Sequence, residues 1–170
     1  MTARATGPTA TTAPAAAATT NIIQSDRRAG PIVIARTTAD ATIGRFGAPQ
    51  TRKRTGPSCV MSWPMLGLTI RFLDFAGRPC TLGVAAVVTI TSREHWRTAV
   101  GLRVGDRVAR LWSLYPRASR QAGIYSPFSG YWLVIRRTCE ELGAAAYPGL
   151  LARARNGRVT ALVVATTACE

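Results

Sequence analysis

The chain has few of the residues from which most active sites are built. Its 170 residues include one histidine, one lysine and eight acidic side chains against 22 basic ones, so the formal net charge is 22 − 8 = +14. A single histidine excludes a metal site with two or more imidazoles, and it leaves His95 as the only base for a histidine-dependent triad. The one acidic pair, Glu140-Glu141, is consecutive, whereas a glycosidase needs two separated carboxylates. No GxGxxG, GK[ST] or GxSxG motif occurs. We therefore expect no enzyme, no metal and no cofactor, and a hydrolase centred on His95 ranks third among the functions we consider.

The chain also lacks long hydrophobic runs. No stretch of about 20 apolar residues is present, so no transmembrane segment is expected. Residues 1–29 are mainly Ala, Thr and Pro, and we predict that they form a disordered lead, because such a segment buries too little surface to offset its chain entropy. Pro8 and Pro14 interrupt the apolar stretch that a secretory signal would need.

The four cysteines are Cys59, Cys80, Cys139 and Cys169, and none belongs to a CxxC pair. Their even number and wide spacing favour disulfides over metal ligation. A Cys59–Cys80 bond and a Cys139–Cys169 bond would each lie within one half of the chain and would each stabilise the fold by roughly 3–4 kcal/mol. Disulfides imply an oxidising compartment, so we expect a secreted or cell-envelope protein whose export signal is not in this chain. The alternative is a cytoplasmic protein with four reduced thiols.

Residues 30–91 are expected to form the first of two similar α+β modules. Thr37 and Thr38 offer caps to a helix over residues 39–46. The basic segment 51–57 is expected to be a loop. Three strands are predicted after it, over residues 59–63, 66–75 and 82–91.

Residues 101–170 are expected to form the second module. Asp106 is placed to cap a helix over residues 107–115. Residues 92–100 should link the two modules as a short helix that Ser92 caps. The modules share an order of elements, which indicates an internal duplication, and each should have a short helix packed on an antiparallel β-sheet.

The second module is also expected to contain a strand over residues 131–137 and a hairpin. The dipeptide Asn156-Gly157 separates predicted strands over residues 150–155 and 159–167, and Asn-Gly is the strongest short signal for a hairpin. The tryptophans that fall on predicted strands and helix faces are expected to lie in the core; they are Trp63, Trp112 and Trp132.

A family resemblance follows from the repeated unit. In this unit a glycine and a short apolar segment lead into a capped helix, which an aromatic residue and a proline follow. The second copy has Gly101 to Asp106 with Tyr115-Pro116, and the fainter first copy has Gly30 to Ile34 with Phe46 to Pro49. This unit resembles the small helix-plus-sheet modules of the β-lactamase-inhibitor-protein type and of the SmpA/OmlA family of outer-membrane lipoproteins. The resemblance covers residues 30–170 as two copies. It implies a binding or envelope role, and no site residue is carried over from it.

The positive charge indicates what the protein could bind. Arginine contacts phosphates and carboxylates in a bidentate manner, so a chain of this charge should attract anionic partners. The possible interaction surface consists of the basic cluster Arg52, Lys53 and Arg54 and of the aromatic residues Tyr125, Phe128 and Tyr131. The alternatives are that the arginines form a solvated surface without a dedicated ligand and that Phe128 packs back onto the sheet. The partner should be a protein or an anionic envelope polymer. A cytosolic nucleic-acid-binding protein is the runner-up, although the sequence has no helix-turn-helix and no RNP-like aromatic motif.

Overall fold

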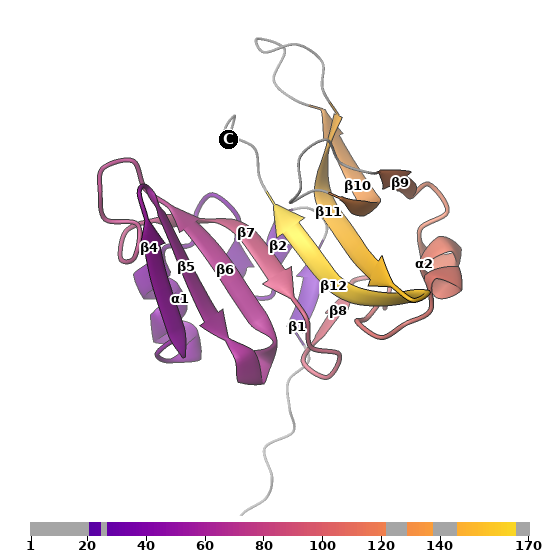
Figure 1. Ribbon diagram of the computed structural model, residues 1–170, viewed down its shortest axis with the longest axis horizontal. Coiled ribbons are helices and arrows are strands. Elements are labelled where there is room, and N and C mark those ends of the chain that lie inside the picture. Colours follow the sequence, from indigo (N-terminus) through magenta and orange to yellow (C-terminus); the bar gives the residue numbers. More distant parts are fainter. Residues whose placement is uncertain (1–20, 25–26, 122–128, 138–145, 166–170) are drawn as a thin grey trace, which may run out of the picture.

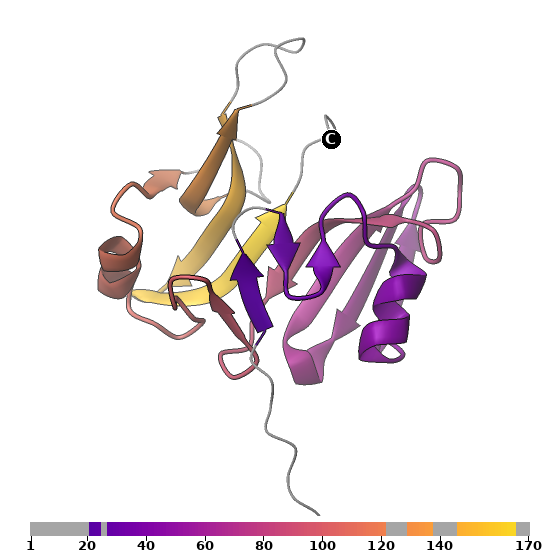
Figure 2. The same cartoon turned by 180° about the vertical axis from the view of Figure 1, so that it is seen from behind.

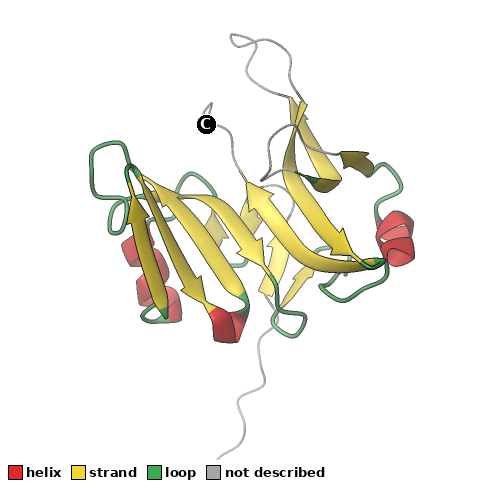
Figure 3. Ribbon diagram, viewed as in Figure 1, coloured by secondary structure: helices red, strands yellow, loops and turns green. Residues whose placement is uncertain are grey.

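The computed structural model describes residues 21–24, 27–121, 129–137 and 146–165. Within these residues the protein is α+β, with two short α-helices, one 3-10 turn and two β-sheets (Figures 1 and 3). The helical elements are α1 (Ala39–Phe46), α2 (Val108–Leu114) and η1 (Pro64–Leu66). Neither helix in this part of the chain is long and apolar enough to cross a membrane.

The larger sheet has eight antiparallel strands in the spatial order β4-β5-β6-β7-β12-β11-β10-β9. Its strands are β4 (Thr51–Thr55), β5 (Ser58–Trp63), β6 (Leu68–Leu73), β7 (Val84–Ile90), β9 (Ser119–Gln121), β10 (Gly130–Arg137), β11 (Ala146–Arg155) and β12 (Arg158–Ala165). The smaller sheet has the order β3-β2-β1-β8, and its β1–β8 pair is parallel. Its strands are β1 (Asn21–Gln24), β2 (Arg28–Ala29), β3 (Ile32–Val33) and β8 (Trp96–Thr98).

The two halves of the chain share the larger sheet. Each half contributes a helix followed by four strands, and the halves meet where β7 pairs with β12. Pairing of these last strands removes two open sheet edges, so the expectation of a separate sheet in each half is replaced by one continuous sheet. Seen from behind, α1 and the smaller sheet lie on one face of the larger sheet, and α2 lies beside the strands of the second half (Figure 2). A single hydrophobic cluster has members from both halves and forms the core.

Several local predictions are confirmed. Helix α1 has the predicted bounds, and the Thr38 hydroxyl accepts a hydrogen bond from the Ala41 N–H at 3.3 Å. The hairpin of β11 and β12 turns at Asn156 and Gly157, whose φ angles are 51° and 71°. Both positions therefore have the left-handed conformation that an Asn-Gly turn supplies. Trp63 is buried, as expected, and its indole N–H donates to the Gly47 carbonyl at 2.9 Å.

The Cys59–Cys80 disulfide is also confirmed, with the two Cα atoms 5.2 Å apart. It ties the buried Cys59 of β5 to the turn before β7, and so it fastens the first half of the sheet across β6. The second predicted bond, between Cys139 and Cys169, involves two positions outside the described residues.

The predicted secondary structure of three segments is wrong. Residues 51–55, expected in a loop, form strand β4, because each of them pairs with a residue of β5 across the turn at Gly56-Pro57. Residues 92–100, expected to be a helical link, contain strand β8, whose Trp96 is fully buried and donates its indole N–H to the Leu66 carbonyl at 2.9 Å. Residues 21–24, expected in the disordered lead, form β1, because Ile23 is fully buried and the strand pairs with β8.

The start of α2 also differs from expectation. Its N-cap residue is Arg107, without a side-chain cap, and the Asp106 carboxylate instead accepts a hydrogen bond from the Arg103 N–H at 2.9 Å. Trp112, expected in the core, is 39% exposed and contacts Tyr131 edge to face, with ring centroids 5.6 Å apart. The helical spacing predicts that Trp112 shares a buried face with Leu111, but of the residues in α2 only Leu111 is buried.

Gly67 is among the glycines that a close approach of the backbone requires. Gly67 has a φ of 56°, and a Cβ at this position would collide with the backbone of Ser92. The contact joins η1 to the segment after β7, where the Thr91 N–H donates to the Gly67 carbonyl at 2.7 Å.

Candidate functional sites

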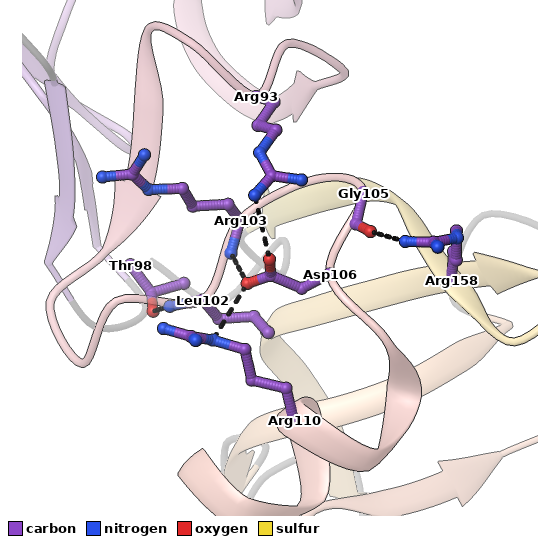
Figure 4. A network of polar contacts seen from close by, with 8 residues as sticks. All are labelled: Arg93, Thr98, Leu102, Arg103, Gly105, Asp106, Arg110 and Arg158. Carbon is purple, nitrogen blue, oxygen red and sulfur yellow. Dashed lines mark hydrogen bonds and ion pairs between the residues drawn. The ribbon is translucent and has the colours of Figure 1, made fainter.

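Asp106 is the centre of a polar network at the start of α2 (Figure 4). Its side chain is only 9% exposed. One carboxylate oxygen, Oδ2, accepts from the Arg103 N–H and lies 3.3 Å from Nε of Arg110. The other, Oδ1, lies 3.9 Å from Nη2 of Arg93. The carboxylate therefore holds a tight turn and orients two arginines.

These arginines surround a small cavity of about 220 Å³, which we call the arginine pocket. Its lining residues are Arg93, Arg97, Gly101, Arg103, Asp106 and Arg110. Four guanidinium groups and one carboxylate give the lining a net charge of 4 − 1 = +3. Figure 4 shows the guanidinium groups of Arg93, Arg103 and Arg110 on the same side of the Asp106 turn.

Two glycines bring the backbone close to the guanidinium groups. Gly101 and Gly105 have φ angles of 91° and 87°, which side chains rarely adopt. A Cβ on Gly101 would be 3.9 Å from Nη2 of Arg110, and one on Gly105 would be 3.3 Å from Nη1 of Arg93. The turn that carries Asp106 is therefore compact enough for both arginines to lie against it.

Hydrogen bonds from outside the arginine pocket hold the backbone around it. Arg158 donates from Nη1 to the Gly105 carbonyl at 2.9 Å, which joins β12 to the turn. The buried Thr98 hydroxyl accepts from the Leu102 N–H at 3.0 Å. Burial raises the pKa of Tyr115 above its ordinary value of 10.0, and a hydrogen bond with Thr98 partly opposes that shift. These contacts fix the backbone on either side of the cavity.

Strand β4 is the second basic surface, and it contains the predicted residues Arg52, Lys53 and Arg54, which we call the basic triplet. It is an edge strand of the larger sheet, and all five of its residues are exposed. Arg52 and Arg54 pair with the buried Met61 and Cys59, so these two arginines share the sheet face that carries α1. Lys53 lies on the opposite face. The cations therefore flank the open edge on both sides.

Of the three predicted interaction aromatics, the structure describes only Tyr131, which lies far from the basic triplet in the sheet. Tyr131 is in β10, which is separated from β4 by five strands, and it is half-buried against Trp112. Tyr125 and Phe128 lie outside the described residues.

His95 does not lie in a recognisable catalytic arrangement. It is half-buried just before β8, and its backbone carbonyl accepts from the Asn21 N–H at 2.7 Å. Its imidazole has no hydrogen bond or ion pair with any described residue, and the neighbouring Glu94 is exposed. Among the described residues, no group of three His, Cys, Asp or Glu side chains could hold a metal ion.

The sequence interpretation missed the arginine pocket. Its four arginines are spread over residues 93–110 and form no run, so a search for basic clusters passes over them. One signal was available: Asp106 is the only acidic residue in residues 97–117, which contain five arginines. The prediction that it caps a helix was wrong. Comparison with protein-family models, curated proteins and solved structures finds no match to this chain.

Proposed function

We propose that this protein is an exported binding protein that docks an extended acidic segment of a partner protein along the outer edge of β4, and that it acts without catalysis. The observation that carries this proposal is the basic triplet on a fully exposed edge strand. The edge lies at one end of the sheet, and no described strand covers it (Figure 1).

A polypeptide is the occupant that fits this edge best. An edge strand presents backbone N–H and C=O groups that another extended chain can pair with. Arg52 and Arg54 on one face and Lys53 on the other can contact acidic side chains that alternate along such a chain. A second copy of β4 is disfavoured, because like charges opposite one another destabilise strand pairing. Nucleic acid would match the charge but could not pair with the backbone.

The disulfide supports export. A Cys59–Cys80 bond persists in oxidising compartments and is rare in the cytosol of most organisms. Thiol titration of the denatured, unreduced protein tests this part of the proposal. We expect no free thiol, whereas four free thiols would indicate a cytosolic protein.

We also propose that the two halves are duplicated modules. The N-cap residues Thr38 and Arg107 each form an isolated bridge with the first residue of the last strand in their own half, Val84 and Arg158 respectively. The hydrogen bonds around these bridges recur. In the first half three backbone N–H groups donate to backbone carbonyls: Ala39 to Gly83, Ala85 to Thr37 and Ala35 to Ala85. In the second half the corresponding bonds are Val108 to Gly157, Val159 to Asp106 and Gly105 to Val159.

A side-chain contact extends this correspondence. The Thr37 hydroxyl accepts from the Val33 N–H at 2.8 Å, and the Asp106 carboxylate accepts from the Arg103 N–H at 2.9 Å. The separations are four residues and three, so one residue is missing from the second turn. Agreement at this level of detail supports a common origin better than a generic helix-then-strands order does.

Binding to poly-L-glutamate tests the docking proposal. The first variant, Arg52→Gln with Arg54→Gln, should weaken binding by about tenfold or more, because two charge-assisted contacts are lost. The matched control, Arg117→Gln with Arg120→Gln, removes the same charge near the opposite edge strand, β9, from two exposed side chains, and it should have little effect.

Two polymers separate strand pairing from simple charge attraction. Poly-D-glutamate has the same charge but the wrong chirality for a regular β-strand, and dextran sulfate has no peptide backbone. Both should bind more weakly than poly-L-glutamate. Equal binding of all three polymers, or equal losses in both double variants, would contradict docking on β4. Tighter, strongly salt-dependent binding of duplex DNA would instead favour the nucleic-acid alternative.

A further inference from the structure

Two of the four arginines of the arginine pocket, Arg103 and Arg110, are not required to build the turn before α2. The first half forms the corresponding turn without them: Val33 occupies the position that matches Arg103, because both donate the equivalent N–H. Ala41 matches Arg110, since each lies three residues after its N-cap. The backbone of this turn therefore forms with apolar side chains at both positions.

The charges in the pocket are only partly balanced. Arg110 approaches Asp106 through Nε, and Arg93 stays 3.9 Å from the carboxylate. The side chains of Arg97 and Arg103 make no hydrogen bond or ion pair with any described residue. Most guanidinium N–H groups around the cavity thus remain available to a ligand.

From this arrangement we infer that the arginine pocket binds a dianionic phosphomonoester. Guanidinium groups match phosphate oxygens in geometry and charge, and several of them can contact one phosphate together. A phosphomonoester has a second pKa of about 6, so it is a dianion at neutral pH, and it neutralises more of the net +3 lining than a single carboxylate does. The volume of about 220 Å³ equals that of roughly seven waters, which is enough for a phosphate group and the start of its substituent.

Asp106 limits which anions the pocket accepts. Its nearly buried carboxylate already pairs with Arg93 and Arg110, so an incoming group must compete with it for those two arginines. A monoanion gains little from Arg97 and Arg103 alone, whereas a dianion has the charge to contact those two and to compete with Asp106 for Arg93 and Arg110 as well. Selectivity for the dianion is therefore the property that distinguishes this site from a generally basic surface.

Calorimetric titration at neutral pH and low salt tests the assignment, with phenyl phosphate as the dianion and benzoate as a monoanion that has the same ring. We expect one phenyl phosphate per chain and binding of benzoate that is weaker by about tenfold or more. Arg97→Gln with Arg103→Gln should reduce phenyl phosphate affinity by about tenfold or more without unfolding the protein, because neither side chain holds a described contact.

The control variant is Arg52→Gln with Arg54→Gln, which removes the same charge from β4. It should keep its affinity for phenyl phosphate and lose affinity for poly-L-glutamate, whereas the Arg97 and Arg103 variant should do the reverse. This inference does not depend on the docking proposal, and the two pairs of variants show which of the two fails.

The phosphomonoester could belong to a soluble metabolite or to a lipid headgroup, and vesicles distinguish these sources. Phosphatidic acid has a phosphomonoester headgroup and phosphatidylglycerol a phosphodiester. Preferential capture of the protein on phosphatidic acid vesicles, reversed by phenyl phosphate, would identify a lipid ligand. Equal capture on the two kinds of vesicle, together with phenyl phosphate binding in calorimetry, would identify a soluble ester. Absence of phenyl phosphate binding, equal affinity for benzoate, or equal losses in both double variants would overturn the assignment.

Discussion

The role of Asp106 leads to a quantitative prediction about stability. Asp106→Asn keeps an acceptor for the Arg103 N–H but removes the charge. A hydrogen bond to a charged group contributes about 1.5–3 kcal/mol and a neutral one about 0.5–1.5 kcal/mol, so the substitution should cost about 1 kcal/mol at this bond. The ion pairs involve arginine side chains that are 60% and 58% exposed, which limits them to about 0.2–1 kcal/mol each. The expected total is about 2 kcal/mol.

Asp106→Ala removes the acceptor as well and should cost about 3 kcal/mol, because the Arg103 N–H then lacks a partner. Urea unfolding followed by tryptophan fluorescence measures both losses, and an unchanged m-value shows that the comparison is between similar states. Asp40→Asn is the matched control: Asp40 is exposed in the first turn of α1, so its loss should cost about 0.3–1 kcal/mol.

High salt separates the two contributions in Asp106→Asn. At about 1 M salt the Debye length is about 3 Å, so the ion-pair part of the loss should shrink while the hydrogen-bond part remains. A loss in Asp106→Asn no larger than in Asp40→Asn would refute the reasoning. A loss equal to that of Asp106→Ala would also refute it, since the retained acceptor would then contribute nothing.

Three further predictions concern the scaffold. Cys59→Ala with Cys80→Ala should lower the free energy of unfolding by about 3 kcal/mol, because loss of a bond that spans 21 residues raises the chain entropy of the unfolded state. A loss below about 1 kcal/mol in urea unfolding would contradict this reasoning. Gly67→Ala and Gly56→Ala impose the same backbone strain, since the φ angles are 56° and 55°, but only the Cβ at Gly67 collides with backbone atoms. The melting temperature of the Gly67→Ala variant should therefore fall clearly further. Equal shifts in the two variants would disprove the close contact. Absorbance titration should give Tyr115 a pKa above 10.0. The free energy of unfolding should fall as the pH rises from about 10 through the pKa of the folded protein, because the unfolded chain releases the proton first. A titration midpoint at or below 10 would contradict the burial of Tyr115.

Local signals predicted much of the fold. The Thr38 cap placed α1 correctly, and Asn156-Gly157 placed the second hairpin, because each depends on the conformation of a few neighbouring residues. The pairing of β7 with β12 joins distant segments and could not be predicted from local sequence. Residues 51–55 are fully exposed and carry no apolar alternation, so only their pairing with β5 makes them a strand.

The position of β8 could not be predicted for a related reason. Trp96 lies among charged and polar residues, so its segment has the pattern of an exposed linker. Its burial depends on β1, which supplies a parallel partner strand, and on η1, which accepts the indole hydrogen bond. The arginine pocket depends on the same arrangement, because Arg97 lies on β8 while Arg103 and Arg110 lie before and within α2.

The proposed duplication explains why a pocket lies at the start of α2. A cavity of about 360 Å³ lies at the start of α1, and its lining includes Thr37 and Ala41 where the arginine pocket has Asp106 and Arg110. A shared turn thus creates a hollow in each half. In the first half a neutral hydroxyl closes the turn. In the second a carboxylate closes it and pairs with Arg93 and Arg110. The proposed anion site therefore combines two differences from the first hollow, a charged acceptor in the turn and arginines where the first half has Val33 and Ala41.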